Sequence, residues 1–308
     1  MANLKDIKTR IMSVQNTRKI TRAMKMVAAA KVKKAESTVK AARPFARELA
    51  NVFKRMLKTV NGSYSLENLR VKSAIDNYPV LLEKREINSI GLLVLTSNKG
   101  LAGAYNANVI RKTIARIKEY NKDGKKVILF VVGQKGLSGL KHKIETLDCE
   151  IVKSYISVAN NVTAMDARII AEDMAEYFVD NKIDKIEIMT TRFKNMMSYS
   201  TQDWEILPLP DDIENCEETK ALDPLMLFEP STNAILQSVV PMYISNIIYQ
   251  ALLEAQASEL ASRMTAMSAA SKNADDMIRL LSIDYNKARQ AAITQELVEI
   301  VSGANALK

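Results

Sequence analysis

The chain has 308 residues, of which 47% are hydrophobic and 26% are charged, enough for one ordinary domain core and further structure besides. No apolar run approaches the roughly 18 residues that cross a bilayer, and the N-terminus lacks a signal-peptide core, so neither a membrane span nor a secretion signal is expected. Cys149 and Cys216 lie far apart without CxxC spacing, and the one histidine, His142, stands between two lysines, which argues for a reducing compartment and against a zinc site or a Cys/His nucleophile pair.

Positive charge is concentrated near the N-terminus. Residues 1–58 carry 16 Lys and Arg against three carboxylates, a net +13, so the rest of the chain carries −4 of the total +9. Three interpretations are open: a solvated helix face, a polyanion ligand, or an acidic protein surface against which the helix moves. Only Phe45 and Phe53 could stack on bases there, which disfavours nucleic acid as the partner.

Residues 1–60 predict one long amphipathic helix. Mostly apolar or small residues recur at alternating steps of three and four, the seam of a coiled coil. No glycine occurs before Gly62 and the only proline is Pro44, so we expect a single helix that bends near Pro44. The predicted seam positions are Leu4, Ile7, Ile11, Val14, Thr21, Met24, Ala28, Val32, Ala35, Phe45, Leu49, Val52 and Met56.

Residues 61–230 predict a central α/β domain. Buried strands are expected at 87–97, 127–132, 150–158 and 183–193, an alternating strand at 199–208, helices at 107–120 and 164–181, a weakly patterned connector at 64–86, and a short glycine-bounded segment at 133–139. Strand and helix alternate, which indicates an open, largely parallel sheet of Rossmann type. The acidic, proline-marked stretch 208–230 is expected to be an exposed loop.

Residues 231–308 predict the second long helix, with Ser231 or Thr232 as its N-cap. Between Thr232 and Ser302 there is no glycine and only one proline, so a bent helix of about 70 residues is sterically allowed. Its predicted seam positions are Leu260, Met264, Met267, Ser271, Ala274, Ile278, Leu281, Tyr285, Ala288 and Ala292.

Two such helices at opposite ends of one chain most simply pair with each other. The chain must then enter and leave the intervening domain at the same end of the helix pair. The predicted fold class is therefore α/β: a long antiparallel coiled coil of the N- and C-terminal helices plus a central Rossmann-like open α/β domain.

The motifs of the chain point away from catalysis. The loop Asn98 to Gly103 could cradle a phosphate, but it fits neither common glycine-rich pattern, and a tight strand-to-helix turn explains it better. Carboxylate pairs such as Glu172/Asp173 and Asp275/Asp276 are adjacent on helices and point in different directions. No catalytic residue, metal ligand or cofactor is predicted. A nucleotide-binding α/β protein with coiled-coil arms, and a basic coiled-coil binder of nucleic acid, remain as alternatives.

Both ends of the chain resemble a known family. The segment IKTRIMSVQNTRKITRAMKMVAA at 7–29, together with ASRMTAM at 261–267, ARQAAITQEL at 288–297 and EIVSGA at 299–304, closely resembles the terminal signatures of the gamma subunit of F-type ATP synthases. The loop 96–106 is similar to that family's third motif, although Asn98, Lys99 and Ala102 stand where the family more often has Asp, Arg and Cys. The resemblance spans the whole chain.

The resemblance implies a rotor that is not itself an enzyme. The terminal helices would form the asymmetric shaft inside the catalytic head of alpha and beta subunits, and the α/β domain would be a foot on the membrane ring of c subunits that also binds the epsilon subunit. Ion-driven rotation would bias each beta subunit among open, loose and tight states. The protein would be peripheral on the cytoplasmic face of a bacterial energy-coupling membrane, or on the equivalent reducing side in an organelle.

Particular residues carry over from the family motifs. Arg289 and Gln290 match an Arg-Gln pair that hydrogen-bonds a loop of the beta subunit, and Thr294 lies one turn further along. Met24 matches a methionine near the acidic lever of beta, where Arg22 and Lys25 would add attraction. The acidic loop at 211–218 is a weak candidate for the c-ring contact, and Cys149 and Cys216 are too far apart for the chloroplast type of thiol switch.

Overall fold

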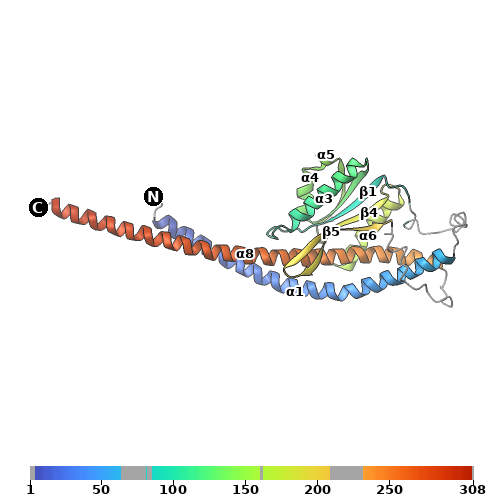
Figure 1. Cartoon of the computed structure of the whole chain (residues 1–308), viewed down its shortest axis with the longest axis horizontal. Helices are drawn as coiled ribbons and strands as arrows, with labels where there is room; N and C mark the ends of the chain where they lie inside the picture. The colour runs from blue at the N-terminus through green and yellow to red at the C-terminus, as the bar shows by residue number, and fades with distance from the viewer. Residues whose placement is uncertain (1–3, 64–80, 82–84, 160–161, 209–231, 307–308) are drawn as a thin grey trace. The chain divides into compact units, whose positions relative to one another are not determined.

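The computed structural model describes residues 4–63, 81, 85–159, 162–208 and 232–306 (Figure 1). It divides into two compact units, one made of residues 1–30 and 263–308 and the other of residues 31–262, and each is described by itself. The elements are α1 (Leu4–Ser63), β1 (Ser89–Leu95), α3 (Tyr105–Lys122), β2 (Lys126–Val132), α4 (Gln134–Lys141), α5 (Ile144–Leu147), β3 (Cys149–Tyr155), α6 (Ala164–Val179), β4 (Lys185–Asn195), β5 (Ser198–Leu207) and α8 (Thr232–Ala306). The predicted fold class is confirmed.

A five-stranded sheet forms the centre of the second unit, in the order β3-β2-β1-β4-β5. β1 pairs in parallel with both β2 and β4, and β2 pairs in parallel with β3. These pairings account for the near-continuous apolar runs of β1 and β2, whose residues from the second onward are all buried. β5 alone is antiparallel, and it follows β4 through a turn in which the Asn195 side-chain oxygen accepts from the backbone N–H groups of Met197 and Ser198.

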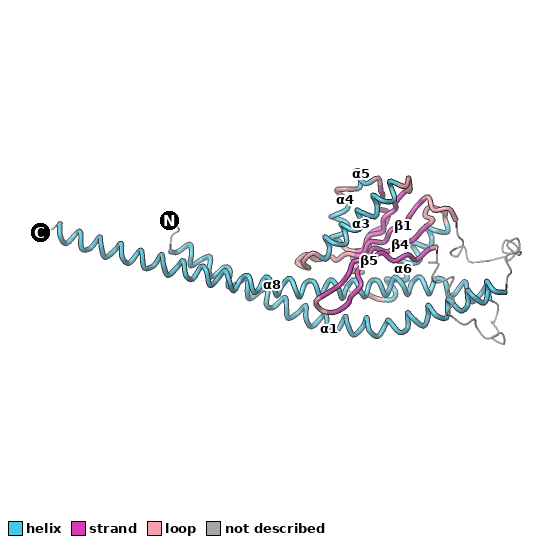
Figure 2. The backbone as a smooth tube through the Cα atoms, viewed as in Figure 1, coloured by secondary structure: helices cyan, strands magenta, loops and turns pink. Residues whose placement is uncertain are grey.

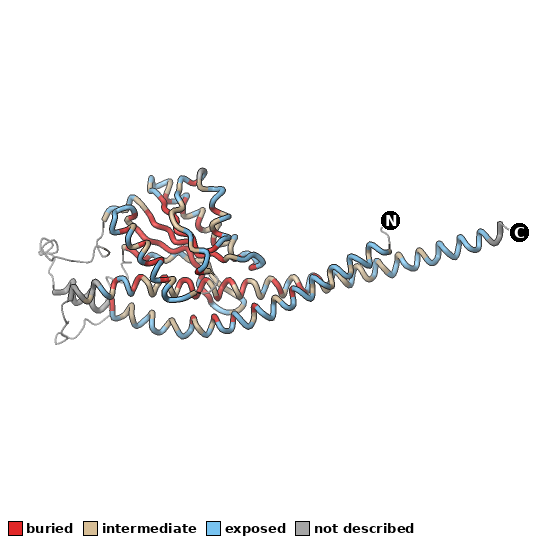
Figure 3. The backbone as a smooth tube through the Cα atoms, turned by 180° about the vertical axis from the view of Figure 1, so that it is seen from behind, coloured by how far each residue is buried: buried red, intermediate tan, exposed pale blue. Residues whose placement is uncertain are grey.

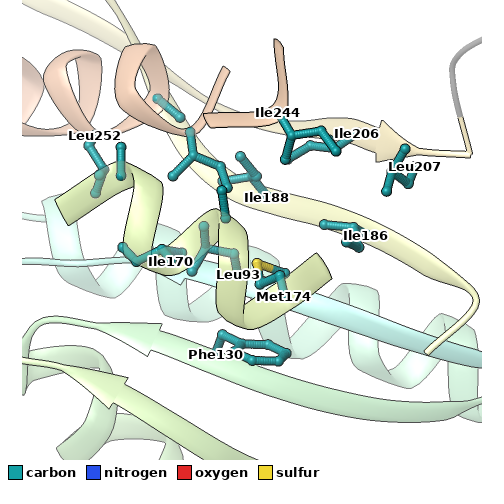
Figure 4. Close-up of a cluster of buried hydrophobic side chains, with 14 of the residues drawn as sticks. Leu93, Phe130, Ile170, Met174, Ile186, Ile188, Ile206, Leu207, Ile244 and Leu252 are labelled. Carbon is teal, nitrogen blue, oxygen red and sulfur yellow. The ribbon is translucent and has the colours of Figure 1, made fainter. Parts of the chain in front are cut away.

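Helices cover both faces of this sheet (Figure 2). On one face, α3, α4 and α5 pack on a core that includes Ile90, Leu92 and Leu129. On the other face, α6 and the first part of α8 pack on a second core. Figure 4 shows ten labelled members of that core: Leu93, Phe130, Ile170, Met174, Ile186, Ile188, Ile206, Leu207, Ile244 and Leu252. The buried strands between the two layers form the densest buried region of the molecule in Figure 3.

Local sequence explains where several elements begin and end. Thr163 and Asp166 form a capping box at the start of α6, each side chain accepting from the other's backbone N–H. The segment after β2, which the sequence predicted only as glycine-bounded, is the helix α4. Gly133 precedes it at φ 92°, a conformation that favours glycine, and a β-carbon there would lie 2.4 Å from the Thr96 carbonyl oxygen.

Within the second unit, α1 and α8 run antiparallel. Phe53 stacks on Tyr243 with ring centroids 4.6 Å apart, and further back along α1 the Arg43 guanidinium pairs with Glu254. Val32, Ala35 and Val39 pack with Leu253, Ala257 and Ala261 in a third cluster. Alanine at three of these six positions lets the two backbones approach closely.

The predicted seam of α1 is wrong at Phe45 and Val52, beyond Pro44, although Leu49 packs against the core as predicted. Phe45 and Val52 are 59% and 45% exposed, whereas Phe53 is fully buried and Leu49 is half-buried. Two contacts fix this face of the helix: the ion pair of Arg43 with Glu254, and the packing of Phe53 on Tyr243. Met56 lies among the residues whose side chains the structure does not describe.

Glu254 is a buried carboxylate that joins three elements. Its side chain has no exposure, and its two oxygens accept from the Arg43 guanidinium of α1 and from the Phe193 backbone N–H of β4, at 3.2 and 3.0 Å. Arg43 in turn donates to the Phe193 carbonyl oxygen at 2.9 Å. Because a buried charge is tolerated only when it is paired and hydrogen-bonded, this arrangement fixes both helices against the end of β4.

No helix in the described residues is long and apolar enough to cross a membrane.

Replacing Gly133 by alanine is expected to destabilise the second unit by about 3 kcal/mol, because the new methyl group would meet backbone at a strained φ. Gly124→Ala is the matched control: its φ is 72°, but nothing lies within 4 Å of the added β-carbon, so we expect only about 1 kcal/mol. Urea unfolding followed by circular dichroism measures both. Equal losses in the two variants would contradict the close approach of Gly133 to Thr96.

Glu254→Ala is expected to destabilise the chain by about 3 kcal/mol, since it leaves the Phe193 N–H without its acceptor and the partly buried Arg43 without its counter-charge. Glu36→Ala removes a carboxylate that is paired with the exposed Lys40 one turn further along α1, and it should cost about 0.5 kcal/mol or less. The same unfolding experiment compares them. A loss at position 254 no larger than at position 36 would show that Glu254 does not hold the three elements together.

Candidate functional site: the helix pair of residues 4–30 and 263–306

The first unit is an antiparallel pair made of the start of α1 and the last part of α8. Arg18 and Arg22 of α1 contact Asp275 of α8, and Thr21 contacts Ser271. From Arg18 to Thr21 the residue numbers of α1 increase while those of the contacted residues of α8 decrease, so the two helices are antiparallel. The predicted seam positions of α1 up to Ala28, and those of α8 from Met264 to Ala292, are all buried or half-buried. The predicted seam is therefore confirmed in this unit.

A polar layer stands in the middle of this seam. The hydroxyl oxygens of Thr21 and Ser271 lie 2.8 Å apart and both residues are buried, while Ser271 also lies within hydrogen-bond distance of the Met267 carbonyl oxygen one turn earlier. Ala28 and Ala274, both small and buried, lie one or two turns away along their own helices. A buried polar pair in an otherwise apolar seam disfavours slipped alignments, because any slip would leave the two hydroxyl groups without each other.

Asp275 binds two arginines from the opposite helix. The guanidinium of Arg18 donates to Oδ1 at 2.7 Å and that of Arg22 donates to Oδ2 at 3.0 Å. The hydrogen bond from Arg18, together with the charge of Arg22, holds the pKa of Asp275 below its usual range. Sequence reasoning dismissed Asp275 as half of a poor acid/base pair. The signal that identifies it is the spacing of Arg18 and Arg22, one turn apart on a single face of α1.

The six residues predicted to contact a beta subunit all lie in this unit, in two groups. Arg22 and Lys25 are exposed on α1, and Met24 between them is half-buried in the seam. Arg22 is already paired with Asp275, whereas Lys25 forms no ion pair with a residue that the structure describes.

The second group lies near the end of α8. Arg289, Gln290 and Thr294 are all exposed, and the Thr294 hydroxyl donates to the Gln290 carbonyl oxygen at 2.9 Å. The structure does not bring the two groups into contact with each other. The structure contains no beta subunit, so the contact of either group with beta stays a prediction.

The last part of α8 is an exposed apolar surface that sequence reasoning did not single out. Every described side chain from Ile293 onward is exposed, as Figure 3 shows for the C-terminal end of α8. The large apolar side chains of this surface are Ile293, Leu297, Val298, Ile300 and Val301. Contiguous exposed apolar side chains on a helix indicate a surface that another protein covers.

The charge of this unit is divided unevenly between its helices. Residues 4–30 contain seven Lys and Arg and one Asp, whereas residues 263–306 contain five basic and five acidic side chains. One side of the pair is therefore strongly basic and the other is neutral. A neighbouring protein would therefore meet a basic surface on one side of the helix pair and a neutral surface on the other.

The glycine-rich loop of the central domain is held by contacts within the chain. The Asn98 side chain donates to the Ile156 carbonyl oxygen and accepts from the Gln134 N–H, and Asn106 accepts from the Ser97 N–H. The Ser262 hydroxyl of α8 donates to the Ala102 carbonyl oxygen at 2.6 Å. These bonds favour the interpretation of the loop as a turn on which α8 packs over its interpretation as a phosphate cradle.

Among the described residues there is no group of three or more His, Cys, Asp or Glu side chains that could hold a metal ion. Cys149 is a free thiol, and burial, together with the charge of Asp148, raises its pKa, which lowers its reactivity. Cys216 and the acidic stretch at 211–218 lie outside the described residues. The exposed basic side chains of residues 4–30 and the exposed apolar side chains near the end of α8 are suited to contact with other proteins.

Comparison with known proteins gives a consistent result. The ATP synthase family model matches residues 3–307. The ATP synthase gamma chains of Synechococcus sp. (strain JA-3-3Ab) and Trichormus variabilis are each 42% identical to this chain, with full coverage of both sequences.

Solved structures agree with these relatives. A chain of the central stalk and c-ring structure of the Tetrahymena thermophila mitochondrial ATP synthase is similar at 29% identity and a TM-score of 0.58, covering 82% of this chain and 99% of that one. A chain of the Euglena gracilis mitochondrial ATP synthase in rotational state 3 has a TM-score of 0.61 at 18% identity, covering 99% and 94%. At that identity the second likeness concerns the fold alone.

The ion pairs of Asp275 predict an acid-sensitive helix pair. A carboxyl whose pKa is lowered on folding contributes stability above its unfolded value and loses it as the pH falls through the folded value. The wild-type chain should therefore melt at a higher temperature than Asp275→Asn at pH 7, and the difference should close as the pH falls below the ordinary value of 3.8. Thermal melts followed by circular dichroism between pH 7 and pH 3 measure this.

Asp276→Asn is the matched control, because Asp276 is exposed and forms no ion pair with a described residue. It should melt with the wild type throughout the pH range. A difference between the wild type and Asp275→Asn that does not depend on pH would contradict the ion pairs with Arg18 and Arg22.

Proposed function

The chain belongs to the ATP synthase gamma family, and from this we propose how its parts act in the enzyme. It is the central-stalk rotor subunit, which couples rotation of the membrane c-ring to synthesis or hydrolysis of ATP in the alpha–beta head. It is not catalytic, because the nucleotide sites lie on the beta subunits. The observation that carries this function is the full-length 42% identity to ATP synthase gamma chains, which includes both helices of the pair.

The helix pair supplies the physical means of coupling. A rotating element changes the state of a neighbour only if it contacts the neighbour's states differently. The basic side of residues 4–30 and the neutral side of residues 263–306 present different surfaces as the pair turns. Each of three surrounding beta subunits then meets a different surface at any moment and is biased toward a different conformation.

We infer two contact regions toward beta. Arg289 and Gln290 would hydrogen-bond a beta-subunit loop, with Thr294 on the same stretch of helix. Lys25, with Met24 beside it, would face the acidic lever of beta. Arg22 contributes less direct attraction than its charge suggests, because Asp275 already accepts from it. Its role is to hold the helix surface that carries Lys25 in place.

The division of labour along the chain follows from this. Residues 1–60 and 231–308 would form the shaft, and residues 61–230 the foot, which meets the c-ring and the epsilon subunit. The subunit is peripheral to the membrane. We place it on the cytoplasmic face of a bacterial energy-coupling membrane, or on the equivalent side of an organelle membrane.

A nucleotide-binding role for the α/β domain is the alternative from another class. It would need the loop between β1 and α3 to face a ligand, whereas the Asn98, Asn106 and Ala102 contacts engage that loop within the chain. No observation on the described residues favours this alternative. Binding of ATP by the isolated chain at micromolar concentration would support the nucleotide-binding role.

The test is ATP hydrolysis by alpha and beta subunits reconstituted with this chain. The double variant Arg289→Ala, Gln290→Ala should still assemble with the ring but turn over about tenfold more slowly, because it loses charge-assisted hydrogen bonds to beta. Arg279→Ala, an exposed change elsewhere on α8, should behave as the wild type.

The outcomes separate two claims. Equal turnover in the wild type and the double variant would overturn the contact assigned to Arg289 and Gln290 while leaving the rotor role intact. If the wild-type chain itself fails to join the alpha–beta ring, the rotor role is wrong.

A further inference from the structure

A pocket of about 440 Å³ lies in the second unit, where α1, α8 and the β4–β5 hairpin meet. We name it the Trp204 pocket, after the one tryptophan of the chain, which lines it. The rotor role described above uses neither the pocket nor its side chains. Its walls come from residues 43–50 of α1, from Arg192, Trp204 and Glu205 of the sheet, and from residues 243–250 of α8.

The apolar part of the pocket is held rigidly. Trp204 is half-buried, and its indole Nε1 donates to the Gln202 side-chain oxygen at 3.1 Å, which fixes the orientation of the ring. Tyr243 is buried and stacks on Phe53, while the rest of the apolar lining is aliphatic: Ala46, Leu49, Ala50 and Ile247. Rigid aromatic side chains beside aliphatic ones are the composition of a protein-binding hot spot, since little conformational freedom is lost when a partner binds.

The charges around the pocket are not balanced. The lining contains three arginines. Arg43 forms an ion pair with the buried Glu254 and donates to the Phe193 carbonyl oxygen. The one carboxylate of the lining, Glu205, is paired with Lys185. Arg47 and Arg192 are exposed, and neither forms an ion pair with any residue in the described part of the chain. Two guanidinium groups without counter-charges therefore flank an apolar lining.

The pocket also adjoins the edge of the sheet. β5 is the last strand in the sheet order and has β4 as its only strand neighbour among the described residues. The outer edge of such a strand presents backbone N–H and carbonyl groups to which an extended segment can hydrogen-bond. Trp204 and Glu205 belong to this strand, so a segment beside β5 would pass the pocket.

We propose that the Trp204 pocket binds an extended acidic segment of a partner protein, with an apolar side chain against Trp204 and carboxylates on Arg47 and Arg192. The apolar lining disfavours a free inorganic anion, which would bury no apolar surface. Of the two aromatic rings in the pocket, Tyr243 is buried against Phe53, so only Trp204 is left for a base to stack on, whereas nucleic-acid sites use several stacking rings along a basic track. The proposal rests on the pocket alone and does not depend on the rotor role.

Trp204 makes the test direct, because as the one tryptophan its fluorescence reports on the pocket without a label. The full chain is titrated with an eight-residue peptide that alternates leucine with glutamate. We expect a saturable change in emission that weakens as salt is added. In the double variant Arg47→Gln, Arg192→Gln the affinity should fall by about tenfold or more, since two charge-assisted contacts are lost.

Matched controls isolate the chemistry. The same peptide with glutamine in place of glutamate should bind at least about tenfold more weakly. Arg168→Gln removes an exposed arginine on α6, outside the pocket, and should leave the affinity unchanged. Circular dichroism confirms that the variants are folded.

Four outcomes would overturn the proposal. Equal binding of the glutamate and glutamine peptides would show that charge is not recognised, and equal binding by the double variant would put the site elsewhere. Saturation by ATP or inorganic phosphate at the affinity of the peptide would assign the pocket to a small anion. Tighter peptide binding after Asp211, Asp212 and Glu214 are changed to their amides would make the chain's own acidic stretch the occupant.

Discussion

The structure depends on one constraint: neither long helix can bury its apolar stripe alone. A helix of the length of α1 or α8 has far more apolar surface than a helix alone in water can stabilise, and its stability comes from packing. In the first unit the first helix of the chain provides that packing for the last one, and in the second unit it shares this role with the sheet and α6. The sheet domain lies in the chain between α1 and α8, which pair with each other.

Polar contacts contribute most to how the helices align, whereas most of the apolar contacts only require that the helices pair. In the first unit the Thr21–Ser271 layer and the two arginines on Asp275 fix the alignment. In the second unit the buried Glu254 does so by joining Arg43 to the end of β4. The seams themselves are rich in alanine, serine and methionine, which would tolerate a shifted alignment. A shaft that transmits torque needs a fixed alignment, and these few polar groups provide it.

The sequence predicted much of this arrangement because most of its signals are local. The apolar runs of β1 and β2, the capping box of α6 and the seam around Ser271 can each be recognised within a short window. Prediction failed where a distant partner decides the outcome. The buried face of α1 beyond Pro44 includes Phe53 because Tyr243 lies opposite, whereas Phe45 and Val52 are exposed in the part of the chain that the structure describes. The candidate site shows the same limit. Arg22 could be located from the sequence, but its engagement by Asp275 depends on the alignment of two segments about 250 positions apart.

Rotation itself is the most direct test of the central claim. A fluorescent or bead probe would be attached to the central domain of this chain, with the alpha–beta head fixed to a surface and ATP supplied. The rotor role predicts that the probe turns in one direction while ATP is hydrolysed and stops when ATP is withdrawn. A probe that stays still while the head continues to hydrolyse ATP would contradict it.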